Sequence, residues 1–318
     1  MTRLLIGGYS GDKGTGSGIA VVDDDNVTAV IPTDSPSWIA RHPQLPVLYA
    51  VAETDHGHVH AWSLVEGAPD KQLGRGDTGG AEPAHLTVDP SGRYLITANY
   101  SGGSISVHRL GPDGSIGERT DLIRHEAHGQ DPRQEQAHPH MVRAADDELL
   151  VTDLGGDAIY RYRLTPDGKL MQEGVIPAPP GSGPRHLLKV GDRTYVTAEL
   201  TGQVLVYDAD WQLLGAVPAS ANRGHNQPSE LVNGGHFLYV GNRGPDSVAV
   251  FEINGILPRY ITEVAVGVWP RHISLDGDQL YVANERSHSV MVMTISQETG
   301  IPALAGTIDV PSPTVVLP

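Results

Sequence analysis

A repeat of about 45 residues runs through the whole 318-residue chain. Each copy has a proline, a short apolar segment, an apolar strand typified by LYVAN, a polar turn and a second strand of the VxVxxL type. Successive copies lie 42 to 56 residues apart, and their prolines are Pro36, Pro83, Pro139, Pro184, Pro228, Pro270 and Pro313. Such a period, with several strands per copy, is typical of a β-propeller in which each copy forms one blade.

The two ends of the chain complement each other. The seventh copy stops at Pro318, whereas segments 4–9 and 19–22 have the pattern of the two strands that this copy lacks. The path from Pro313 through the joined ends to Pro36 is 41 residues, which fits the other spacings. We therefore predict an all-β fold, a seven-bladed β-propeller with one blade closed by the N- and C-terminal strands, and a single domain over residues 1–318.

Composition agrees with a chain of short strands and turns. The 38 Gly and 24 Pro residues disfavour a helical bundle, because both residues destabilise helix interiors. A formal net charge of −16 disfavours binding to nucleic acid, and the absence of Cys excludes disulfides and thiolate metal sites. The apolar run near the N-terminus is too short for a secretory signal, and the chain lacks an apolar stretch that could cross a bilayer. We expect a cytoplasmic protein without a membrane partner.

Familiar catalytic motifs are missing from the sequence. There is no G-x-S-x-G, no phosphate-binding G-x-x-x-x-G-K-[ST] and no H-E-x-x-H. The glycine-rich segment 14–18 is predicted to be a turn, and the polar segment 125–135 an inserted loop within the domain. Candidate functional residues must therefore come from the repeat itself.

Two positions of the repeat should form rings around the axial channel, because equivalent residues of a propeller lie at the same radius and height. We expect the first ring at the end of the LYVAN strand and the second directly after each proline. The first ring is Tyr9, Glu53, Asn99, Asp153, Glu199, Asn242 and Asn284, and the second is Ser37, Ala84, His140, Arg185, Ser229, Arg271 and Thr314. The His and two Arg of the second ring predict a locally positive sector, whereas the three Asn of the first ring can be explained as caps of backbone groups.

Other side chains allow alternative interpretations. His85, His186 and His272 recur two residues after a proline and are expected to pack between blades. The pair His138 and His140, or the oxygen-rich first ring, could suggest a metal such as Ca²⁺, but the cationic sector opposes this. We expect neither a metal nor another cofactor.

Several segments resemble a known family. These are DLGGD at 153–157, GPRHL at 183–187, YVTAEL at 195–200 and LYVGNRGPDS at 238–247. Over nearly its full length the chain resembles the lactonase family of seven-bladed propellers, which includes propeller-type 6-phosphogluconolactonases and a fungal carboxymuconate cyclase. The resemblance implies an active site of one His, two Arg and one Glu, which fall on His140, Arg185, Glu199 and Arg271. His138, two residues from His140, is an alternative to that histidine.

The expected function is hydrolysis of a sugar-acid lactone, with 6-phosphoglucono-1,5-lactone as the first choice, in the pentose phosphate pathway of carbohydrate metabolism. Lactone opening needs a base and a stabilised oxyanion, and His140 is the natural base near neutral pH to activate water in the channel mouth. Glu199 could instead be the base, or could orient an Arg or the His, and it is a possible ion-pair partner of Arg185. Arg185 and Arg271 suit an anionic substrate. The residues expected to bind the small anionic lactone are Arg185, Arg271, His138, Asn242 and Asn284. A carboxymuconate cyclase-type isomerase and a non-catalytic interaction scaffold are the alternatives.

Overall fold

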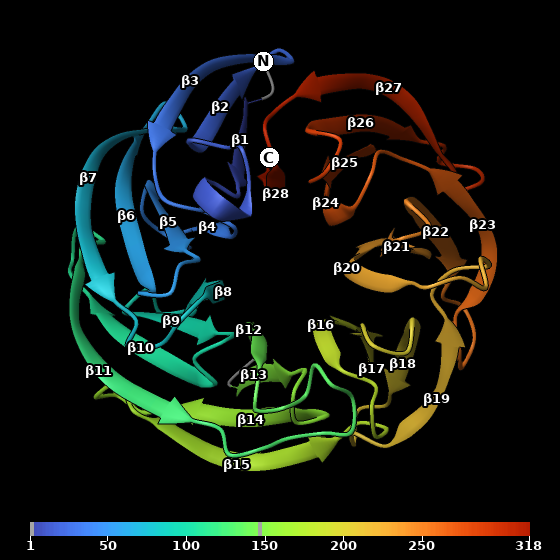
Figure 1. Cartoon of the computed structure of the whole chain (residues 1–318), viewed down its shortest axis with the longest axis horizontal. Helices are drawn as coiled ribbons and strands as arrows, with labels where there is room; N and C mark the ends of the chain where they lie inside the picture. Colours follow the sequence, from blue (N-terminus) through green and yellow to red (C-terminus); the bar gives the residue numbers. More distant parts are fainter. Residues whose placement is uncertain (1–2, 146–147) are drawn as a thin grey trace.

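Seven four-stranded antiparallel sheets are arranged as blades around a central axis (Figure 1). The structure, a computed structural model, describes residues 3–145 and 148–318, and within these ranges it contains 28 strands and one short 3-10 helix, η1 (Gly11–Lys13). The predicted seven-bladed propeller is therefore confirmed.

The blades follow one another along the chain, and in each the strand that begins at or close to the proline of the repeat is nearest the axis. From inner to outer strand they are blade 1 with β28 (Pro313–Leu317), β1 (Arg3–Gly8), β2 (Gly18–Asp23) and β3 (Asn26–Pro32); blade 2 with β4 (Ile39–Arg41), β5 (Val47–Ala52), β6 (His58–Val65) and β7 (Ala68–Asp77); blade 3 with β8 (Pro83–Val88), β9 (Tyr94–Asn99), β10 (Ser104–Leu110) and β11 (Ile116–Arg124); blade 4 with β12 (Pro139–Ala145), β13 (Glu148–Asp153), β14 (Ala158–Leu164) and β15 (Leu170–Pro177); blade 5 with β16 (Pro184–Val190), β17 (Arg193–Ala198), β18 (Gln203–Tyr207) and β19 (Leu213–Pro218); blade 6 with β20 (Gln227–Gly234), β21 (Phe237–Arg243), β22 (Ser247–Glu252) and β23 (Arg259–Ala265); and blade 7 with β24 (Pro270–Asp276), β25 (Gln279–Asn284), β26 (Ser289–Ile295) and β27 (Pro302–Asp309).

The ring closes where the two ends of the chain meet. Strand β28 pairs antiparallel with β1, placing Leu5 opposite Leu317 and Ile6 opposite Val316. Figure 1 shows β28 next to β1 in this blade. Closure gives β28 a partner inside the ring and removes a free sheet edge, as the repeat predicts.

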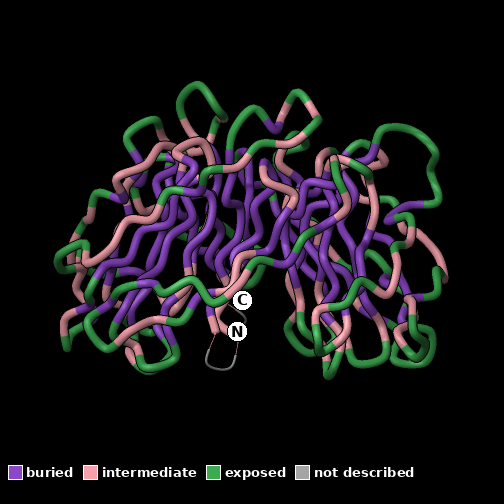
Figure 2. The backbone as a smooth tube through the Cα atoms, turned by 90° about the horizontal axis from the view of Figure 1, so that it is seen from below, coloured by how far each residue is buried: buried purple, intermediate pink, exposed green. Residues whose placement is uncertain are grey.

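Burial decreases from the middle strands of each blade to the outer strand. Every residue of β9 is buried because both faces of this strand are covered by neighbouring blades, whereas nearly all of β3 is exposed. Figure 2 shows the buried strands running between exposed loops on the two faces of the ring. The loops at one end of the inner strands are therefore free to build a site around the axis.

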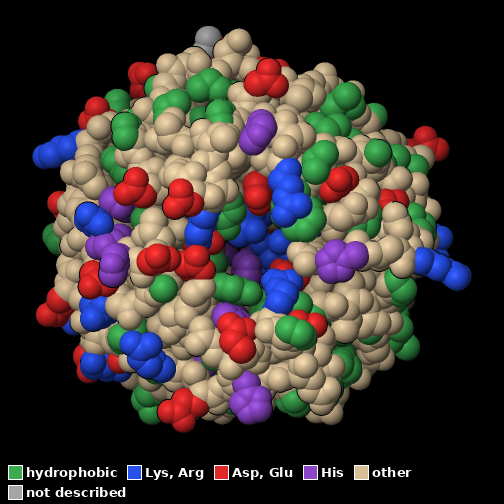
Figure 3. Space-filling view, viewed as in Figure 1, with side chains coloured by type: hydrophobic (Ala, Val, Ile, Leu, Met, Phe, Trp, Pro, Cys, Tyr) green, Lys and Arg blue, Asp and Glu red, His purple; other side chains and the backbone are tan. Residues whose placement is uncertain are grey.

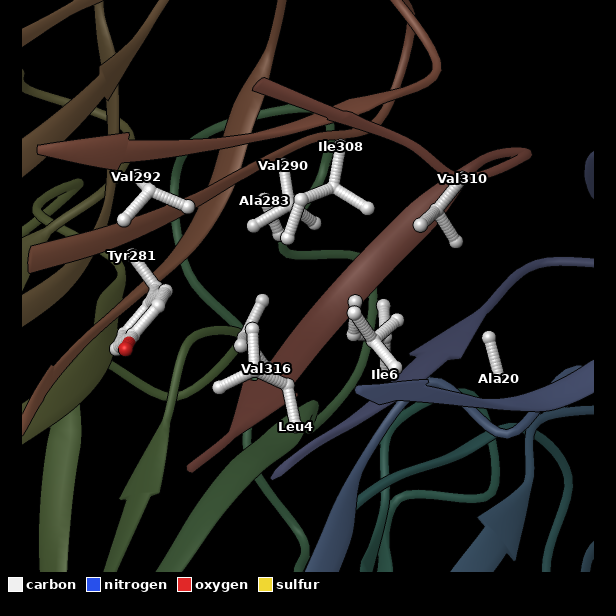
Figure 4. Close-up of a cluster of buried hydrophobic side chains, with 11 residues drawn as sticks. Leu4, Ile6, Ala20, Tyr281, Ala283, Val290, Val292, Ile308, Val310 and Val316 are labelled. Carbon is white, nitrogen blue, oxygen red and sulfur yellow. The ribbon is translucent and has the colours of Figure 1, made fainter. Parts of the chain in front are cut away.

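The core consists of apolar clusters between adjacent blades. In the cluster that joins blade 1 to blade 7, Leu4, Ile6 and Val316 face Val290 and Ile308 (Figure 4). All five side chains are no more than 2% exposed. The interface that closes the ring is thus packed like a protein interior.

Candidate active site

A cavity of about 190 Å³ lies at the mouth of the axial channel, and residues from all seven blades or their loops line it. Figure 3 shows basic, acidic and His side chains around the central hollow of one face. The lining residues are Tyr9, Glu53, Glu82, Ala84, Tyr100, Arg133, His140, Glu199, Arg243 and Arg271.

A bulge in the inner strand directs His140 toward this cavity. Pro139 pairs with Asp153, but the next pair is Met141 with Thr152, so His140 has no residue opposite it. Such an extra residue bends a strand and re-aims its side chain. The inner strands of blades 3, 5, 6 and 7 shift register at the same place after their prolines, which is how the ring of residues following each proline is presented to the channel.

The imidazole of His140 is buried and neutral. His140 is only 6% exposed. Burial lowers the pKa of His140 well below 6.5, and the positive charges of Arg185 and Arg271 lower it further. Its Nδ1 atom is buried and has no hydrogen-bond partner among the described residues, which leaves Nε2 as the nitrogen available to the cavity. A neutral imidazole in this position can accept a proton.

Glu199 is held by three guanidinium groups. Arg133 Nη2 donates to Oε1 at 2.5 Å and Arg243 Nη2 donates to Oε2 at 2.6 Å, while Arg185 Nε lies 3.0 Å from Oε2. Burial raises the pKa of this carboxyl, but Arg243, Arg185 and Arg133 lower it to far below its ordinary value. Glu199 is therefore ionised and serves as an anchor for cations.

Arg185 lies behind the cavity. It is 2% exposed, its Nη1 donates to the carbonyl oxygen of Ser229 at 2.6 Å, and it is not one of the lining residues. The family resemblance predicts Arg185 at the substrate. The structure instead uses it as a buried partner of Glu199, because an unpaired charge at this depth would be costly.

A second group of charged residues faces Glu199 across the cavity. The Tyr9 hydroxyl donates to Glu53 Oε1 at 2.7 Å, and Arg271 Nη2 donates to the Tyr9 oxygen. The Arg271 guanidinium also lies 4.7 Å from the centroid of the Tyr9 ring and 3.9 Å from both Glu53 Oε2 and Glu285 Oε2. Arg271 is thus at the cavity, as predicted, but its charge is shared with two carboxylates.

The cavity is not the cationic pocket that the sequence predicted. Counting the described residues that line it, Arg133, Arg243 and Arg271 are balanced by Glu53, Glu82 and Glu199. Each buried guanidinium needs a carboxylate nearby, and of these pairs the sequence indicated only Arg185 with Glu199, which lie 3.0 Å apart.

The first ring predicted from the sequence combined two positions of the strand. The inner-strand proline of blade 5 pairs with Ala198, but that of blade 6 pairs with Asn242, so Glu199 corresponds to Arg243 and not to Asn242. Successive residues of a strand point to opposite faces, so this difference of one residue changes the residues in the ring. The residues that share the position of Glu199 are Tyr9, Glu53, Tyr100, Leu154, Arg243 and Glu285, whose backbones bond or pair with the residue before each blade's proline.

Asn242 and Asn284 are consequently not brought to the cavity. Both are fully buried, and their side-chain amides donate to backbone carbonyl oxygens, of Ala219 for Asn242 and of Val282 for Asn284. These contacts fit the capping interpretation of the strand-end Asn residues. We therefore leave both out of the proposed substrate contacts.

His138 supports the wall of the cavity. Its ring stacks on Tyr100 with centroids 4.5 Å apart, and its Nε2 lies 3.2 Å from Glu135 Oε1. It is 4% exposed and is not among the lining residues, whereas Tyr100 is. Of the two candidate histidines, the structure places His140 at the cavity and His138 behind it.

Sequence analysis missed Arg243, although a signal for it exists. A tyrosine precedes the ring position by four residues in four blades, at Tyr49, Tyr195, Tyr239 and Tyr281. Alignment of the copies on this tyrosine, instead of on the polar residue that ends the strand, would have placed Arg243 and Glu285 in the ring.

Arg133 was also missed, because it belongs to the inserted loop and not to the repeat. Residues 125–138 connect β11 to β12. Gln134 Oε1 accepts from the backbone of Gln130 and Asp131, and Gln134 Nε2 donates to Leu154, so the loop is fixed to blade 4. It carries Arg133 to Glu199, with the arginine side chain 41% exposed.

The recurring histidines pack across the axis and not between blades. Trp38 of blade 2 lies with ring centroids 4.0 Å from His85, 5.5 Å from His186 and 5.2 Å from His272, which come from blades 3, 5 and 7. Contacts among blades this far apart in the ring are possible only near its centre. These aromatic rings therefore form a floor beneath the cavity, because the inner strands direct them toward the channel.

Metal-binding clusters and membrane-spanning helices are both absent from the described residues. In residues 3–145 and 148–318 there is no group of three or more His, Asp or Glu side chains that could hold a metal ion. Likewise, none of the helices in these ranges has the length and apolar character needed to cross a membrane.

The fold and the site together define a propeller in which a buried histidine and ion-paired arginines face a small cavity at the channel mouth. The chain belongs to the lactonase family: it matches the family described as "Lactonase, 7-bladed beta-propeller" over residues 3–318.

Known proteins support this assignment. A 6-phosphogluconolactonase of Bacillus subtilis (strain 168) is 29% identical over 89% of this chain and 86% of its own length. A 6-phosphogluconolactonase of Formosa agariphila is 30% identical over 93% of each chain. The structure of a periplasmic gluconolactonase from Pseudomonas aeruginosa is similar with a TM-score of 0.91, 28% identity and coverage of 99% of this chain and 98% of that chain.

Proposed function

We propose that this protein hydrolyses a sugar-acid lactone, with 6-phosphoglucono-1,5-lactone as its substrate and 6-phosphogluconate as the product. The observation that carries the proposal is the neutral His140 facing a cavity that Arg243 and Arg271 also line. The family and the names of the two lactonase relatives support the same reaction. The proposed reaction belongs to carbohydrate metabolism, in the pentose phosphate pathway, and a cytoplasmic location is part of the proposal.

His140 is the proposed general base. Its Nε2 takes a proton from water as the water oxygen attacks the lactone carbonyl carbon. The carbonyl oxygen gains negative charge, which the guanidinium of Arg271 stabilises with the help of Arg243. When the bond between the carbonyl carbon and the ring oxygen breaks, the protonated His140 returns the proton to the leaving oxygen, giving the open hydroxy acid.

Glu199 is proposed to support the site and not to act as the base. Its two oxygens already accept hydrogen bonds from Arg133 and Arg243, and its lowered pKa makes it a poor proton acceptor. It holds these two guanidiniums, and Arg185 behind them, in place around the substrate. This assigns distinct roles to the two residues that the sequence left as alternative bases.

The distal phosphate of the substrate is proposed to bind at the rim. Arg133 and Lys13 have side chains that are 41% and 30% exposed, which makes them accessible to a phosphate that extends out of the cavity. Lys13 lies 2.6 Å from Glu82 and 3.3 Å from Glu53, which hold its ammonium group near the mouth. Arginine can bind phosphate through two parallel hydrogen bonds, so Arg133 is the main candidate.

An enzyme reading fits the site better than the scaffold alternative. A surface that binds other proteins needs an accessible patch, whereas this cavity is lined by side chains that are mostly buried and directed toward the axis. Burying so many charges is costly for a chain that gains no ligand from them.

The proposal is tested by measuring hydrolysis of 6-phosphogluconolactone and of unphosphorylated gluconolactone above the spontaneous rate in buffer. His140→Ala should lower kcat by about 10²–10⁴-fold with KM little changed. His236→Ala, the same change at an exposed histidine, is the matched control and should behave as the wild type. No acceleration of either lactone by the wild type, or full activity in His140→Ala, would overturn the proposal.

A further inference from the structure

The channel beneath the cavity contains buried histidine nitrogens whose hydrogen bonds are not accounted for. Within the described part of the chain, Nδ1 of His140, Nε2 of His186 and both ring nitrogens of His85 are buried without a partner. His140 is 6% exposed and His186 is 1% exposed. An unpaired buried polar atom costs about 1–3 kcal/mol, so two neighbouring ones call for an explanation.

The two rings come from adjacent blades and contact each other. His140 is on β12 and His186 on β16, with ring centroids 5.1 Å apart and planes at 65°. His140 directly follows the inner-strand proline of its blade, and His186 lies two residues after that of the next blade. Both are in the segment where the strand changes register. This separation allows the two unpaired nitrogens to meet after a small ring rotation, or through one water.

A carboxylate completes the arrangement on the next blade. Glu230, on β20, is 6% exposed, and its Oε2 lies 2.7 Å from Nδ1 of His186. Its other oxygen, Oε1, accepts a hydrogen bond from the backbone N–H of Leu231 at 2.9 Å. Burial raises the pKa of Glu230, whereas His272, the Leu231 N–H and Arg185 lower it. As a carboxylate, Glu230 would accept hydrogen bonds from both Leu231 and His186.

We propose that Glu230 and His186 are positioning residues that fix His140 in the tautomer with Nδ1 protonated and Nε2 free to act as the base. The chain runs from the Glu230 carboxylate to His186 and then to His140, across blades 6, 5 and 4. The role of His140 as base rests on the proposed function, but the tautomer is a property of the folded protein alone.

The tautomers follow step by step along this chain. His186 donates its Nδ1–H to the Glu230 carboxylate, so a neutral His186 has a bare acceptor at Nε2. Nε2 of His186 therefore needs a hydrogen-bond donor, and on the His140 side this donor is the Nδ1–H of His140. A neutral imidazole carries one proton, so Nε2 of His140 is left unprotonated on the side of the cavity.

His272 and Arg185 are close to this chain but are not members of it. His272 Nε2 lies 3.8 Å from Glu230 Oε2, beyond hydrogen-bond distance, and its Nδ1 accepts from the backbone N–H of Val316 at 3.3 Å. Arg185 is bound to Glu199 and Ser229.

The test measures ring ¹⁵N chemical shifts of the histidines by NMR at neutral pH, with the His140 signals assigned from their loss in His140→Gln. The wild type should show His140 as a single tautomer with Nδ1 protonated. Glu230→Gln, which removes the charge at nearly the same size, should give a mixture of tautomers and lower kcat by about 10- to 100-fold with KM within twofold. His186→Gln should do the same, and it replaces Glu230→Gln if that variant does not fold.

His85→Gln is the matched control. His85 is equally buried in the channel at 4% exposure and contacts His186, but it does not bond Glu230 in the structure as described. It should leave both the His140 tautomer and kcat unchanged, even if stability falls.

Two results would overturn the proposal: a wild-type His140 with Nε2 protonated, or a tautomer that stays the same in Glu230→Gln and His186→Gln. The NMR result is independent of the proposed function. If the protein hydrolyses no lactone but His140 shows the expected tautomer, the lactonase proposal fails and the positioning of His140 by Glu230 and His186 stands.

Discussion

At the scale of single residues, neighbours decide which ionisable group can move a proton. Glu199 and His140 both belong to the site, and the sequence allowed either to be the base. Three guanidiniums stabilise the charged form of Glu199, whereas burial and nearby cations stabilise the neutral form of His140. Arg185 and Arg243 thus act on both groups, because they favour the charged form of Glu199 and the neutral form of His140.

The first prediction concerns the pH dependence of hydrolysis. Only neutral His140 accepts a proton, and its pKa is well below the ordinary 6.5. Therefore kcat/KM should remain on its plateau as pH falls through 6.5 and should decline only in more acid solution. The measurement is the rate from pH 8 to 5 after subtraction of spontaneous hydrolysis at each pH. A midpoint at 6.5 or above would contradict the assignment.

The second prediction separates the two ends of the substrate. Arg133→Ala should raise KM for 6-phosphogluconolactone by about 10- to 100-fold, because a hydrogen bond to a charged group is lost. KM for unphosphorylated gluconolactone should change little. Arg271→Ala should lower kcat/KM for both lactones, because Arg271 serves the reacting carbonyl. If instead Arg271→Ala affects only the phosphorylated lactone, then the phosphate binds at Arg271.

At the scale of elements, the site depends on two departures from a regular blade. One is the bulge after the inner-strand proline, which turns His140 toward the cavity. The other is the inserted loop 125–138, which brings Arg133 to Glu199. Regular strands supply the frame, and these irregular segments supply the His140 and Arg133 side chains that line the cavity.

The third prediction tests the inserted loop. Gln134 is fully buried and holds three backbone groups, so Gln134→Ala should loosen the loop and raise KM for the phosphorylated lactone by about 5- to 30-fold, with kcat little changed. Gln130→Ala, at an exposed position of the same loop, is the control and should have no effect. Equal KM values for the two variants would show that Gln134 does not position Arg133.

At the scale of the whole molecule, the histidines of the axial channel also affect the stability of the fold. Its floor contains histidines that are buried in a neutral state, and burial is the first cause of their lowered pKa values. These residues are His85, His140, His186 and His272.

The fourth prediction is a loss of stability in mild acid. In the unfolded chain these histidines bind protons near pH 6.5. In the folded protein they bind protons only when the pH approaches their lowered pKa values, about 4 for His272. The unfolded state thus holds more protons, and the free energy of unfolding should fall as pH decreases from 7 to 5. The slope is about 1.4 kcal/mol per pH unit for each histidine that stays neutral. Urea denaturation at several pH values measures it, and His85→Gln should reduce the slope. A flat profile would contradict the buried neutral state.

The sequence alone determined the propeller and the closure of its ring. Seven copies with a common spacing each have to bury an apolar strand against a neighbour, and the last copy lacks strands that only the first segment can provide. The position of His140 and Arg271 at the channel mouth was also predicted from the sequence, because they directly follow a proline whose place in the blade is fixed by the repeat.

The membership of the site was decided by tertiary structure. Whether Asn242 or Arg243 faces the cavity depends on strand register, since a shift of one residue moves a side chain to the other face. Arg133 lines the cavity from a loop outside the repeat. Arg185 lies behind the cavity, where it is paired with Glu199. Local sequence specifies strands and turns, but which charges become neighbours is settled only when seven blades converge on one axis.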